Sequence, residues 1–509
     1  MELEFDRDTL TYWETVAEVT LCQEETLETI VPDACPDILR IVDVCGQAML
    51  TGKQAREGAA QVTGLVRAAI LYQPEGAPGL GRMEVGLPFT CQAEAPGLTD
   101  RGQVQASPRL RQAEARVLNP RKVLLRVDLA IEITACQPVD RPVCRGVLEG
   151  EEGSVCQRRY QGETYQLSAL EEKPFTFQQQ VRLPALQGEG GRLLAMRARP
   201  VCTESRLIGS KLILKGTTEL DLLAGDDAGA LSASHESMPF SQIMEVPGVG
   251  EEGECQVTVE LTDLSCQSEG SDERQLEVTL ELLAQAQVCC RRPVTLLQDL
   301  YSTSHLTEVD GEVLPLRQLE ERSVRPQGVR ELLETGETVR GVADSRLALG
   351  QVKQSREGEQ LVLSAEVWVT VLYLDQEEQV RCVRRTVNVD CRLDCPQDCQ
   401  CTCTVQCPGE IFAAPAAGGV EVRFTLEFAC LVTRQVAVPV VKGARLGEAR
   451  GAGQGPRPSV VLRLAAPGEG VWDIAKAYGT TKEEILQANE LEEELLPPGK
   501  MLLIPSVRG

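Results

Sequence analysis

A long internal repeat constrains the fold of this 509-residue chain more than any other feature of its sequence. Residues 53–58 (KQAREG) return as residues 353–358 (KQSREG), a separation of 300 residues (353 minus 53). A β-type run follows each copy, at residues 62–72 (VTGLVRAAILY) and 363–373 (LSAEVWVTVLY), and residues 214–223 (LKGTTELDLL) give a weaker third version. A period of about 150 residues is far longer than the ~20–50 residues of a solenoid repeat, so it predicts three homologous domains.

The end of each repeat carries a second alternating pattern. It spans residues 123–133 (VLLRVDLAIEI), 276–284 (LEVTLELLA) and 420–428 (VEVRFTLEF). Apolar and polar residues alternate in all three, which is the mark of a strand with one buried face. Gly216 also matches Gly64, at an offset of 152 (216 minus 64). The repeats are therefore predicted to be rich in β-structure, and packing as a β-sandwich is one form they could take.

Helical spacing is scarce within the repeats. The best candidate is residues 294–301 (VTLLQDLY), where Val294, Leu297 and Tyr301 would share one helical face. We expect a helical connector at this position.

Changes in composition divide the chain into five predicted segments. After residue 442 the sequence becomes rich in glycine and proline and loses its hydrophobic period, which is typical of a flexible linker. The predicted segments are three repeat domains at 1–160, 161–310 and 311–442, a linker at 443–457 and a C-terminal domain at 458–509.

The C-terminal segment predicts a small βααβ domain. A strand at residues 460–464 is followed by a Gly-containing turn and a helix that carries Val471 and Trp472. Gly479 suits the left-handed conformation that ends such a helix. Residues 481–484 (TKEE) form a capping box for a second helix, and residues 501–504 (MLLI) form the closing strand. The chain is thus predicted to be mainly β, with three repeat domains and one small βααβ domain.

This βααβ segment resembles a LysM domain. The resemblance rests on residues 468–475 (GEGVWDIA), 478–480 (YGT), Ile485 with Asn489, and 498–505 (PGKMLLIP). LysM domains bind N-acetylglucosamine chains in a shallow groove between the first strand–helix loop and the last helix–strand loop. The resemblance implies that a glycan or a protein partner is bound by Gly468, Glu469, Gly470, Trp472, Asn489 and Leu491. The family's usual Asp-Thr pair is Glu469-Gly470 here, so one hydroxyl group that could bind sugar is missing.

The upstream region resembles the SPOCS-domain proteins of endospore-forming clostridia, the SipL type. Residues 31–39 (VPDACPDIL) and 299–302 (DLYS) carry this resemblance, together with the order of three β-rich repeats before a LysM domain. It implies a spore-coat scaffold that is made in the cytoplasm of the mother cell and acts at the forespore surface. Its implied partner is a basal-layer coat ATPase of the SpoIVA type, or another coat protein, with the LysM domain as a protein-docking module.

Charge and hydropathy bear on the possible partners. The formal net charge is −25 and no Lys/Arg-rich run is present, which argues against nucleic acid as a partner because the average field repels phosphate. No run of 18 apolar residues predicts a transmembrane segment. The acidic start, MELEFD, lacks the features of a secretory signal, so we expect no export by that route. Binding of peptidoglycan or N-acetylglucosamine in the wall or spore cortex remains the alternative function.

No motif in the sequence predicts catalysis, a metal or a cofactor. The chain has only two histidines and no P-loop, and the GxGxxG at residues 248–253 precedes a predicted strand rather than the helix that a dinucleotide site needs. Six of the 20 cysteines cluster at positions 391, 395, 399, 401, 403 and 407. Three interpretations stay open for this cluster: small apolar side chains facing a core, which we favour, a metal site, and oxidative cross-linking. We therefore expect no catalytic residue, no metal ligand and no cofactor.

Overall fold

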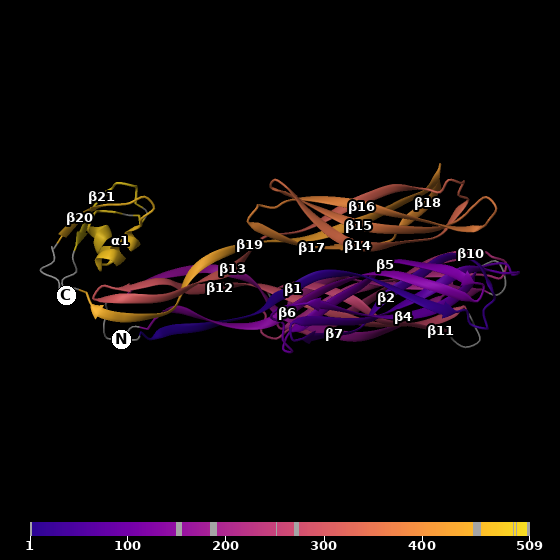
Figure 1. The fold of residues 1–509 in the computed structure, drawn as a ribbon, viewed down its shortest axis with the longest axis horizontal. Coiled ribbons are helices and arrows are strands. Elements are labelled where there is room, and N and C mark those ends of the chain that lie inside the picture. The colour runs from indigo at the N-terminus through magenta and orange to yellow at the C-terminus, as the bar shows by residue number, and fades with distance from the viewer. Residues whose placement is uncertain are drawn as a thin grey trace.

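The computed structural model describes residues 3–148, 155–183, 191–250, 252–268, 274–450, 460–491, 493–494 and 496–505. Three β-rich units precede a small C-terminal domain (Figure 1). We refer to residues 5–147 as unit 1, 155–302 as unit 2 and 305–449 as unit 3. The prediction of a mainly β chain that ends in a βααβ domain is confirmed.

The strands follow the same order in each unit. Unit 1 contains β1 (Phe5–Ile30), β2 (Ile38–Arg56), β3 (Ala59–Pro74), β4 (Gly81–Glu94), β5 (Gln103–Asn119) and β6 (Lys122–Val147). Unit 2 contains β7 (Val155–Arg182), β8 (Arg192–Ile208), β9 (Lys211–Gly225), β10 (Leu231–Glu245), β11 (Glu254–Ser268) and β12 (Gln275–Ser302). Unit 3 contains β13 (His305–Glu334), β14 (Gly341–Glu357), β15 (Gln360–Leu374), β16 (Val380–Asp394), β17 (Cys399–Gln406), β18 (Phe412–Ala416) and β19 (Gly419–Ala449). The C-terminal domain contains β20 (Val460–Leu464), α1 (Val471–Tyr478), α2 (Lys482–Ala488) and β21 (Met501–Pro505).

Each unit is a two-layer sandwich. Its first and last strands pair antiparallel along their length, as in β1 with β6, where the register runs from Phe5 opposite Val147 to Ile30 opposite Lys122. A three-stranded meander, such as β2-β3-β4, forms the second layer. Trp13 pairs with Leu167, which joins the long strands of units 1 and 2 into one six-stranded sheet.

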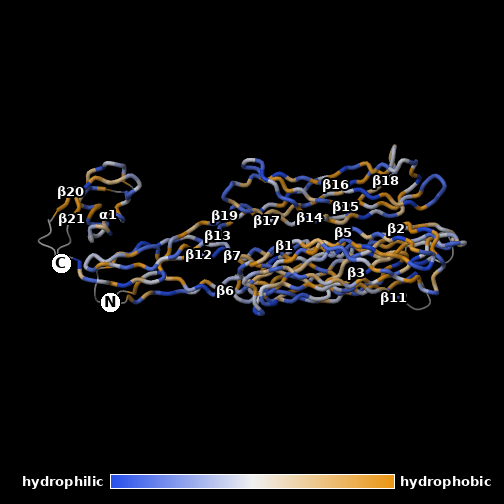
Figure 2. The backbone as a smooth tube through the Cα atoms, in the orientation of Figure 1, coloured by the Kyte–Doolittle hydropathy of each residue, from blue (hydrophilic) through white to orange (hydrophobic). Residues whose placement is uncertain are grey.

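The alternating patterns bury one face of each strand. In β6 the side chains of Val123, Leu125, Val127, Leu129, Ile131 and Ile133 are all at most 1% exposed. Burial of one such side chain contributes about 1.5–3 kcal/mol, so this strand alone supplies a large part of the core of unit 1. The strand predictions at residues 123–133, 276–284 and 420–428 are confirmed. Figure 2 shows the same alternation of hydrophobic and hydrophilic positions along the sandwich strands.

The long strands extend beyond the sandwiches and meet in a shared stalk (Figure 1). One cluster in this stalk joins Val143 of unit 1, Leu296 of unit 2, and Leu316 and Val438 of unit 3. A second cluster again contains side chains from all three units. The three units therefore share a hydrophobic core at the stalk in addition to their own cores.

The expected helical connector at residues 294–301 is wrong, because these residues form the end of strand β12. The register shifts between Leu297 and Asp299 as β12 pairs with β7, and such an irregularity interrupts the period of two. The strand is also surrounded by other strands of the stalk, so Leu296 and Leu297 are both 0% exposed. Because both faces of this strand carry buried apolar side chains, the spacing of apolar residues in the sequence resembles that of a helix.

The segment 443–457, where we expect a linker, begins within regular structure. Strand β19 continues to Ala449 and pairs with β13, for example Val309 opposite Ala444. The apolar side chain of Leu446 is 4% exposed within this strand. Residues 451–457 lie outside the described residues.

The repeat also governs the register of the meanders. A shift in register precedes Asp43, Ala195 and Asp344, which pair with Leu71, Leu223 and Leu372 in the three units. These positions are separated by 152 (195 minus 43) and 301 (344 minus 43) residues, which are the offsets of the sequence repeat. Equivalent positions of the three units can therefore be compared residue by residue.

Candidate functional site

The C-terminal domain places its binding loops through two short capped helices. Gly470 precedes α1 with an extended backbone, and the Asp473 carboxylate accepts its N–H at 3.0 Å. At the other end Gly479 takes the left-handed conformation (φ 67°), which a residue with a Cβ adopts at a cost. The predicted capping box of α2 is confirmed, because Thr481 accepts the Glu484 N–H and Glu484 accepts the Thr481 N–H, both at 3.2 Å.

The first predicted binding loop is exposed at its turn. Gly468 has a positive φ of 79°, and a Cβ at this position would meet nothing within 4 Å. The Glu469 carboxylate accepts hydrogen bonds from Arg463 at 2.6 Å and from the Ala466 N–H at 3.0 Å, so it holds the turn closed. Gly470 is half-buried at the start of α1.

The second predicted loop lies against the first. The Val471 N–H donates to the Glu494 carbonyl at 3.1 Å, which brings the end of the first loop beside residues 493–494. Leu491 is half-buried and packs on the domain core. The Asn489 amide donates to the carbonyls of Ile485 and Leu503 at 2.7 Å, and it ties α2 to β21 rather than facing solvent freely. The structure thus brings together the two loops that the resemblance to LysM domains predicts to form the binding groove.

Trp472 is buried against the rest of the chain. It is 5% exposed, and its indole N–H donates to the carboxylate of Asp299 in β12 at 2.8 Å. The Lys476 ammonium group, one turn further along α1, donates to both oxygens of the same carboxylate at 2.7 and 2.8 Å. Asp299 therefore holds α1 through one neutral and one charged donor, and hydrogen bonds to a charged group are stronger than neutral ones.

Tyr301 completes the contact between the C-terminal domain and the stalk. Its ring packs edge-on against Trp472 at a centroid distance of 4.9 Å, and its hydroxyl group donates to the Thr480 carbonyl at 2.8 Å. Tyr301 is 0% exposed and belongs to the same core as Ile474 and Ile485. Burial raises the pKa of Tyr301, so the hydroxyl group stays protonated as a donor. A stalk residue is therefore part of the hydrophobic core of the C-terminal domain.

A second anchor lies at the end of α1. The Arg450 guanidinium group donates to the carbonyls of His305 in β13 and Lys476 in α1, at 3.1 and 3.2 Å. A Cβ on Gly479 would come within 3.0 Å of the Arg450 side chain. The absence of a side chain at Gly479 thus permits both the helix end and the close approach of Arg450.

Asp299 and Tyr301 are functional positions that local pattern analysis does not assign. Residues 299–302 stand out in the sequence through their resemblance to a family motif, and the helical spacing of residues 294–301 predicts a different structure. The structure gives these residues a role as the receptor for α1.

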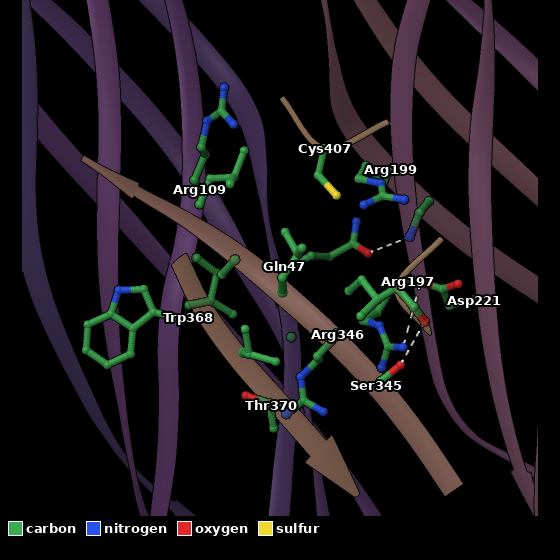
Figure 3. A pocket seen from close by; sticks show the side chains of 18 of the residues that line it. Gln47, Arg109, Arg197, Arg199, Asp221, Ser345, Arg346, Trp368, Thr370 and Cys407 are labelled. Atoms are coloured by element: carbon green, nitrogen blue, oxygen red, sulfur yellow. Dashed lines mark hydrogen bonds and ion pairs between the residues drawn. The ribbon is translucent and has the colours of Figure 1, made fainter. Parts of the chain in front are cut away.

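A cleft of about 720 Å³ lies where the three units meet, and several arginines line it (Figure 3). Its arginines are Arg109, Arg111, Arg197, Arg199, Arg346 and Arg384. Most of them contact acidic residues: Arg111 pairs with Glu366 at 2.9 Å, and Arg197 lies 3.7 Å from Asp221. Ion pairs inside the cleft therefore help to join the units, beside a hydrophobic cluster that also contains side chains of all three units.

The repeat explains how these ion pairs are arranged. Arg197 of unit 2 makes a two-pronged pair with Asp344 of unit 3, at 2.8 Å for both bonds. Arg346 of unit 3, the equivalent of Arg197, pairs with Asp43 of unit 1 at 2.6 Å. Burial favours the neutral form of Asp43, but Arg346 and Arg384 outweigh it and hold the pKa of Asp43 well below its usual range.

The third junction departs from this pattern. Cys45 stands at the position equivalent to Arg197 and Arg346, two residues after Asp43. Ala195 stands at the position equivalent to Asp43 and Asp344. At this position the contact between units 1 and 2 therefore lacks the ion pair found at the other two contacts. Units 1 and 2 are joined elsewhere, by the continuous six-stranded sheet and by ion pairs such as Arg67 with Asp263 at 2.9 Å.

The clustered cysteines lie in the core of unit 3. Cys391, Cys395, Cys399 and Cys407 are at most 4% exposed, and Cys401 and Cys403 pack beside them. This location agrees with the interpretation as small apolar side chains. Within the described ranges, no group of three or more His, Cys, Asp or Glu residues is arranged to hold a metal ion.

Comparison with protein-family models identifies two domains. Residues 191–269 match the SPOCS domain of the SipL family, and residues 466–505 match the LysM domain. The first match covers β8 to β11 of unit 2, and the second covers α1, α2 and β21. No curated protein and no solved structure matches the chain.

The fold and the site together define a β-sandwich repeat protein that ends in a small binding domain. The chain contains a SPOCS domain and a C-terminal LysM domain, which is the architecture predicted from the sequence. Both domains are of binding or scaffold type, and together they fit a sporulation-related scaffold. Neither helix in the described ranges is long and apolar enough to span a membrane.

Proposed function

We propose that this chain is a non-enzymatic scaffold of endospore coat assembly, which tethers a basal-layer coat ATPase of the SpoIVA type to the forespore surface. Its place of action is the cytoplasm of the mother cell, at the surface of the forespore. The LysM domain and the SPOCS-like units each hold a partner in this proposal, and another coat protein could take the place of the ATPase. In this proposal we take units 1, 2 and 3 as the three repeat domains.

The fixed position of the LysM domain is the observation that carries this proposal. Asp299 and Tyr301 hold α1 on the stalk through hydrogen bonds and ring packing. The loop at Gly468–Gly470 remains at the surface beside residues 493–494. A fixed, preformed loop pair loses less conformational freedom on binding than a freely tethered domain, which favours recognition of one protein partner.

The chemistry of the loops also favours a protein partner. Gly470 replaces the hydroxyl-bearing residue that is usual in LysM domains, and Glu469 is engaged by Arg463. Glu490 and Glu493 are exposed on the second loop, so a basic protein surface would be complementary in charge. We assign Gly468, Glu469, Gly470 and Leu491 to the partner contact, with Trp472 and Asn489 supporting the loops from within.

The alternative function is binding of peptidoglycan or N-acetylglucosamine chains. The match to the LysM family supports it, because this family includes glycan-binding domains. In that case the repeats would act as spacers, and the LysM loops would hold the sugar chain.

Retention experiments with the full-length chain separate these functions. The isolated segment 458–509 is a poor substitute, because it lacks Tyr301 from its core. The full chain is passed over immobilised coat ATPase and, separately, over insoluble peptidoglycan and chitin. Binding to the ATPase without retention on the glycans supports the scaffold, and retention on glycans without ATPase binding supports the alternative.

A further inference from the structure

Two cysteines face each other directly in the sheet of unit 3. Cys403 of β17 pairs with Cys430 of β19 in the antiparallel register, and their sulfur atoms lie 3.8 Å apart. Directly opposed residues of antiparallel strands have Cβ atoms about 4.5–5.5 Å apart, and a disulfide needs about 3.5–4.5 Å. A small closing movement of the two strands would therefore bring the sulfurs to bonding distance.

Neither of the other cysteines of β17 stands directly opposite a cysteine. Cys399 stands opposite Arg434, and Cys401 stands opposite Val432. Among the strand pairs in the described part of the chain, Cys403 with Cys430 is the one that places cysteine opposite cysteine. All 20 cysteines are present as free thiols in this structure.

The two thiols differ in exposure and acidity in a way that suits sequential oxidation. Cys403 is half-buried and reachable by a small oxidant, whereas Cys430 is 2% exposed. Hydrogen bonding with the thiols of Cys401 and Cys403 lowers the pKa of Cys430 and favours its thiolate, which is the nucleophilic form. The same contact with Cys430, together with burial, raises the pKa of Cys403, so Cys430 holds the thiolate of the pair. Burial instead raises the pKa of Cys391 and Cys407 in the same core, so these thiols are less reactive.

We propose that Cys403 and Cys430 form an intramolecular disulfide bond when the protein meets a peroxide oxidant. The Cys430 thiolate first takes the proton of Cys403, so that the more exposed Cys403 sulfur attacks the peroxide, becomes a sulfenic acid and releases hydroxide, which recovers this proton to become one water molecule. The Cys430 thiolate then attacks that sulfur, forms the S–S bond and displaces hydroxide, which takes a proton to become a second water molecule. In total, two thiols and one hydrogen peroxide give one disulfide and two waters, and the peroxide accepts two electrons.

The bond would secure an edge of the sheet. Strand β17 has only eight residues and lies at the end of the order β13-β19-β17. Short edge strands open more easily than central ones, because only one neighbour pairs with them. A bond from β17 to the central strand β19 would remove this opening and restrict the unfolded chain between residues 403 and 430.

Peptide mapping of the full-length protein tests the proposal. The reduced chain is treated with a stoichiometric amount of hydrogen peroxide and quenched with catalase. Remaining thiols are then alkylated, and the protein is digested without reductant and analysed by mass spectrometry. We expect a linked peptide pair that contains Cys403 and Cys430, with the mass of two hydrogen atoms lost. Alkylation at the exposed Cys22 should fall in the same sample, which confirms that the oxidant acted.

Two variants and an unfolding measurement complete the test. The linked pair should disappear in Cys403→Ser and persist in Cys399→Ser, which changes the same face of the same strand opposite Arg434. Oxidation should raise the unfolding temperature of the parent and of Cys399→Ser but not of Cys403→Ser. The proposal would be overturned if Cys403 and Cys430 were fully alkylated in the oxidised parent while the alkylation of Cys22 fell. Linkage of Cys430 to any other cysteine would do the same.

Discussion

The indole N–H of Trp472 donates a 2.8 Å hydrogen bond to the carboxylate of Asp299, which joins the LysM domain to the end of β12. These residues are 173 positions apart in the chain. Lys476 adds an ion pair to the same carboxylate, and Tyr301 adds its ring to the LysM core. The LysM domain is thus built on the stalk rather than attached only through the chain that precedes it.

Replacement of Asp299 by alanine should loosen this attachment. Asp299→Ala removes the acceptor of Trp472 and leaves the Lys476 ammonium group without its partner, which we expect to cost about 1–3 kcal/mol. Hydrogen exchange followed by mass spectrometry should show faster exchange of the α1 amides in the full-length variant. Asp310→Ala, at an exposed position of β13, is the matched control and should leave exchange unchanged. Equal exchange of α1 in Asp299→Ala and the parent would refute a role for Asp299 in docking.

Gly64→Ala should destabilise unit 1 through a clash across the sheet. A Cβ on Gly64 would overlap the ring of Phe89, its cross-strand partner, and would also come within 2.6 Å of the Met49 carbonyl oxygen, so we expect a loss of about 1–3 kcal/mol in urea unfolding. The equivalent pair in unit 3 is Ala365 opposite Val389, where both side chains fit together. The double variant Gly64→Ala/Phe89→Val should therefore be more stable than the sum of the single changes predicts.

The control for this cycle lies on the neighbouring strand. A Cβ on Gly86 would meet only Leu65, at an ordinary distance of 3.5 Å, so Gly86→Ala should have a small effect. Strict additivity of the Gly64 and Phe89 changes would show that the contact with the Phe89 ring does not limit stability.

These pairs show what the sequence predicts and where it fails. The offset between Gly64 and Gly216 predicts the repeat correctly, because equivalent strands keep the same residues against the same neighbours. The alternation of apolar and polar residues predicts the strands correctly, because one face of each strand packs on the core. At residues 294–301 the pattern misleads, since Leu296 and Leu297 are both buried and the register shifts before Asp299.

A single sequence does not indicate which residues of different units are in contact. Nothing near Arg197 or Asp344 indicates that they meet, because 147 residues separate them and their pairing depends on how two sandwiches pack. The same holds for Asp299 and Trp472. The LysM motif predicts which loops come together, but its receptor on the stalk follows only from the assembled fold.

Glu260 should make stability depend on pH. Burial raises the pKa of Glu260 to about 7, a shift that Arg109 and Lys53 reduce and Glu132 reinforces. The folded state therefore keeps this proton between the usual carboxyl pKa of 4.5 and about 7, whereas the unfolded chain releases it. The stabilisation from this proton is complete below about pH 4.5 and is lost as the pH rises to about 7.

The variant Glu260→Gln removes this dependence. At pH 8 it should be more stable than the parent by about 1–3 kcal/mol, and the difference should shrink toward pH 4. Urea unfolding at several pH values measures both quantities. Glu277→Gln, at an exposed position of β12, is the control. A difference between Glu260→Gln and the parent that grows toward low pH would contradict the assignment.

The buried pair between units 2 and 3 should be costly to break on one side. Arg197→Met leaves the Asp344 carboxylate, which is 6% exposed, with only Arg346 at 3.6 Å, so we expect a loss of about 3–5 kcal/mol. The double variant Arg197→Met/Asp344→Leu removes both charges and should recover most of that loss. Urea unfolding distinguishes the variants, and a double variant as unstable as the single one would show that the pair itself holds the units together.

Binding of the full-length chain to a basal-layer coat ATPase of the SpoIVA type tests the scaffold proposal most directly. Biolayer interferometry with the immobilised ATPase should give a Kd of about 1 µM or tighter. Glu493→Lys, which reverses a charge on the exposed second LysM loop, should weaken binding by about tenfold. The matched reversal Glu277→Lys on β12 should not change it, and peptidoglycan should not retain the parent chain. Retention of the parent on peptidoglycan, with no binding to the ATPase, would contradict the account.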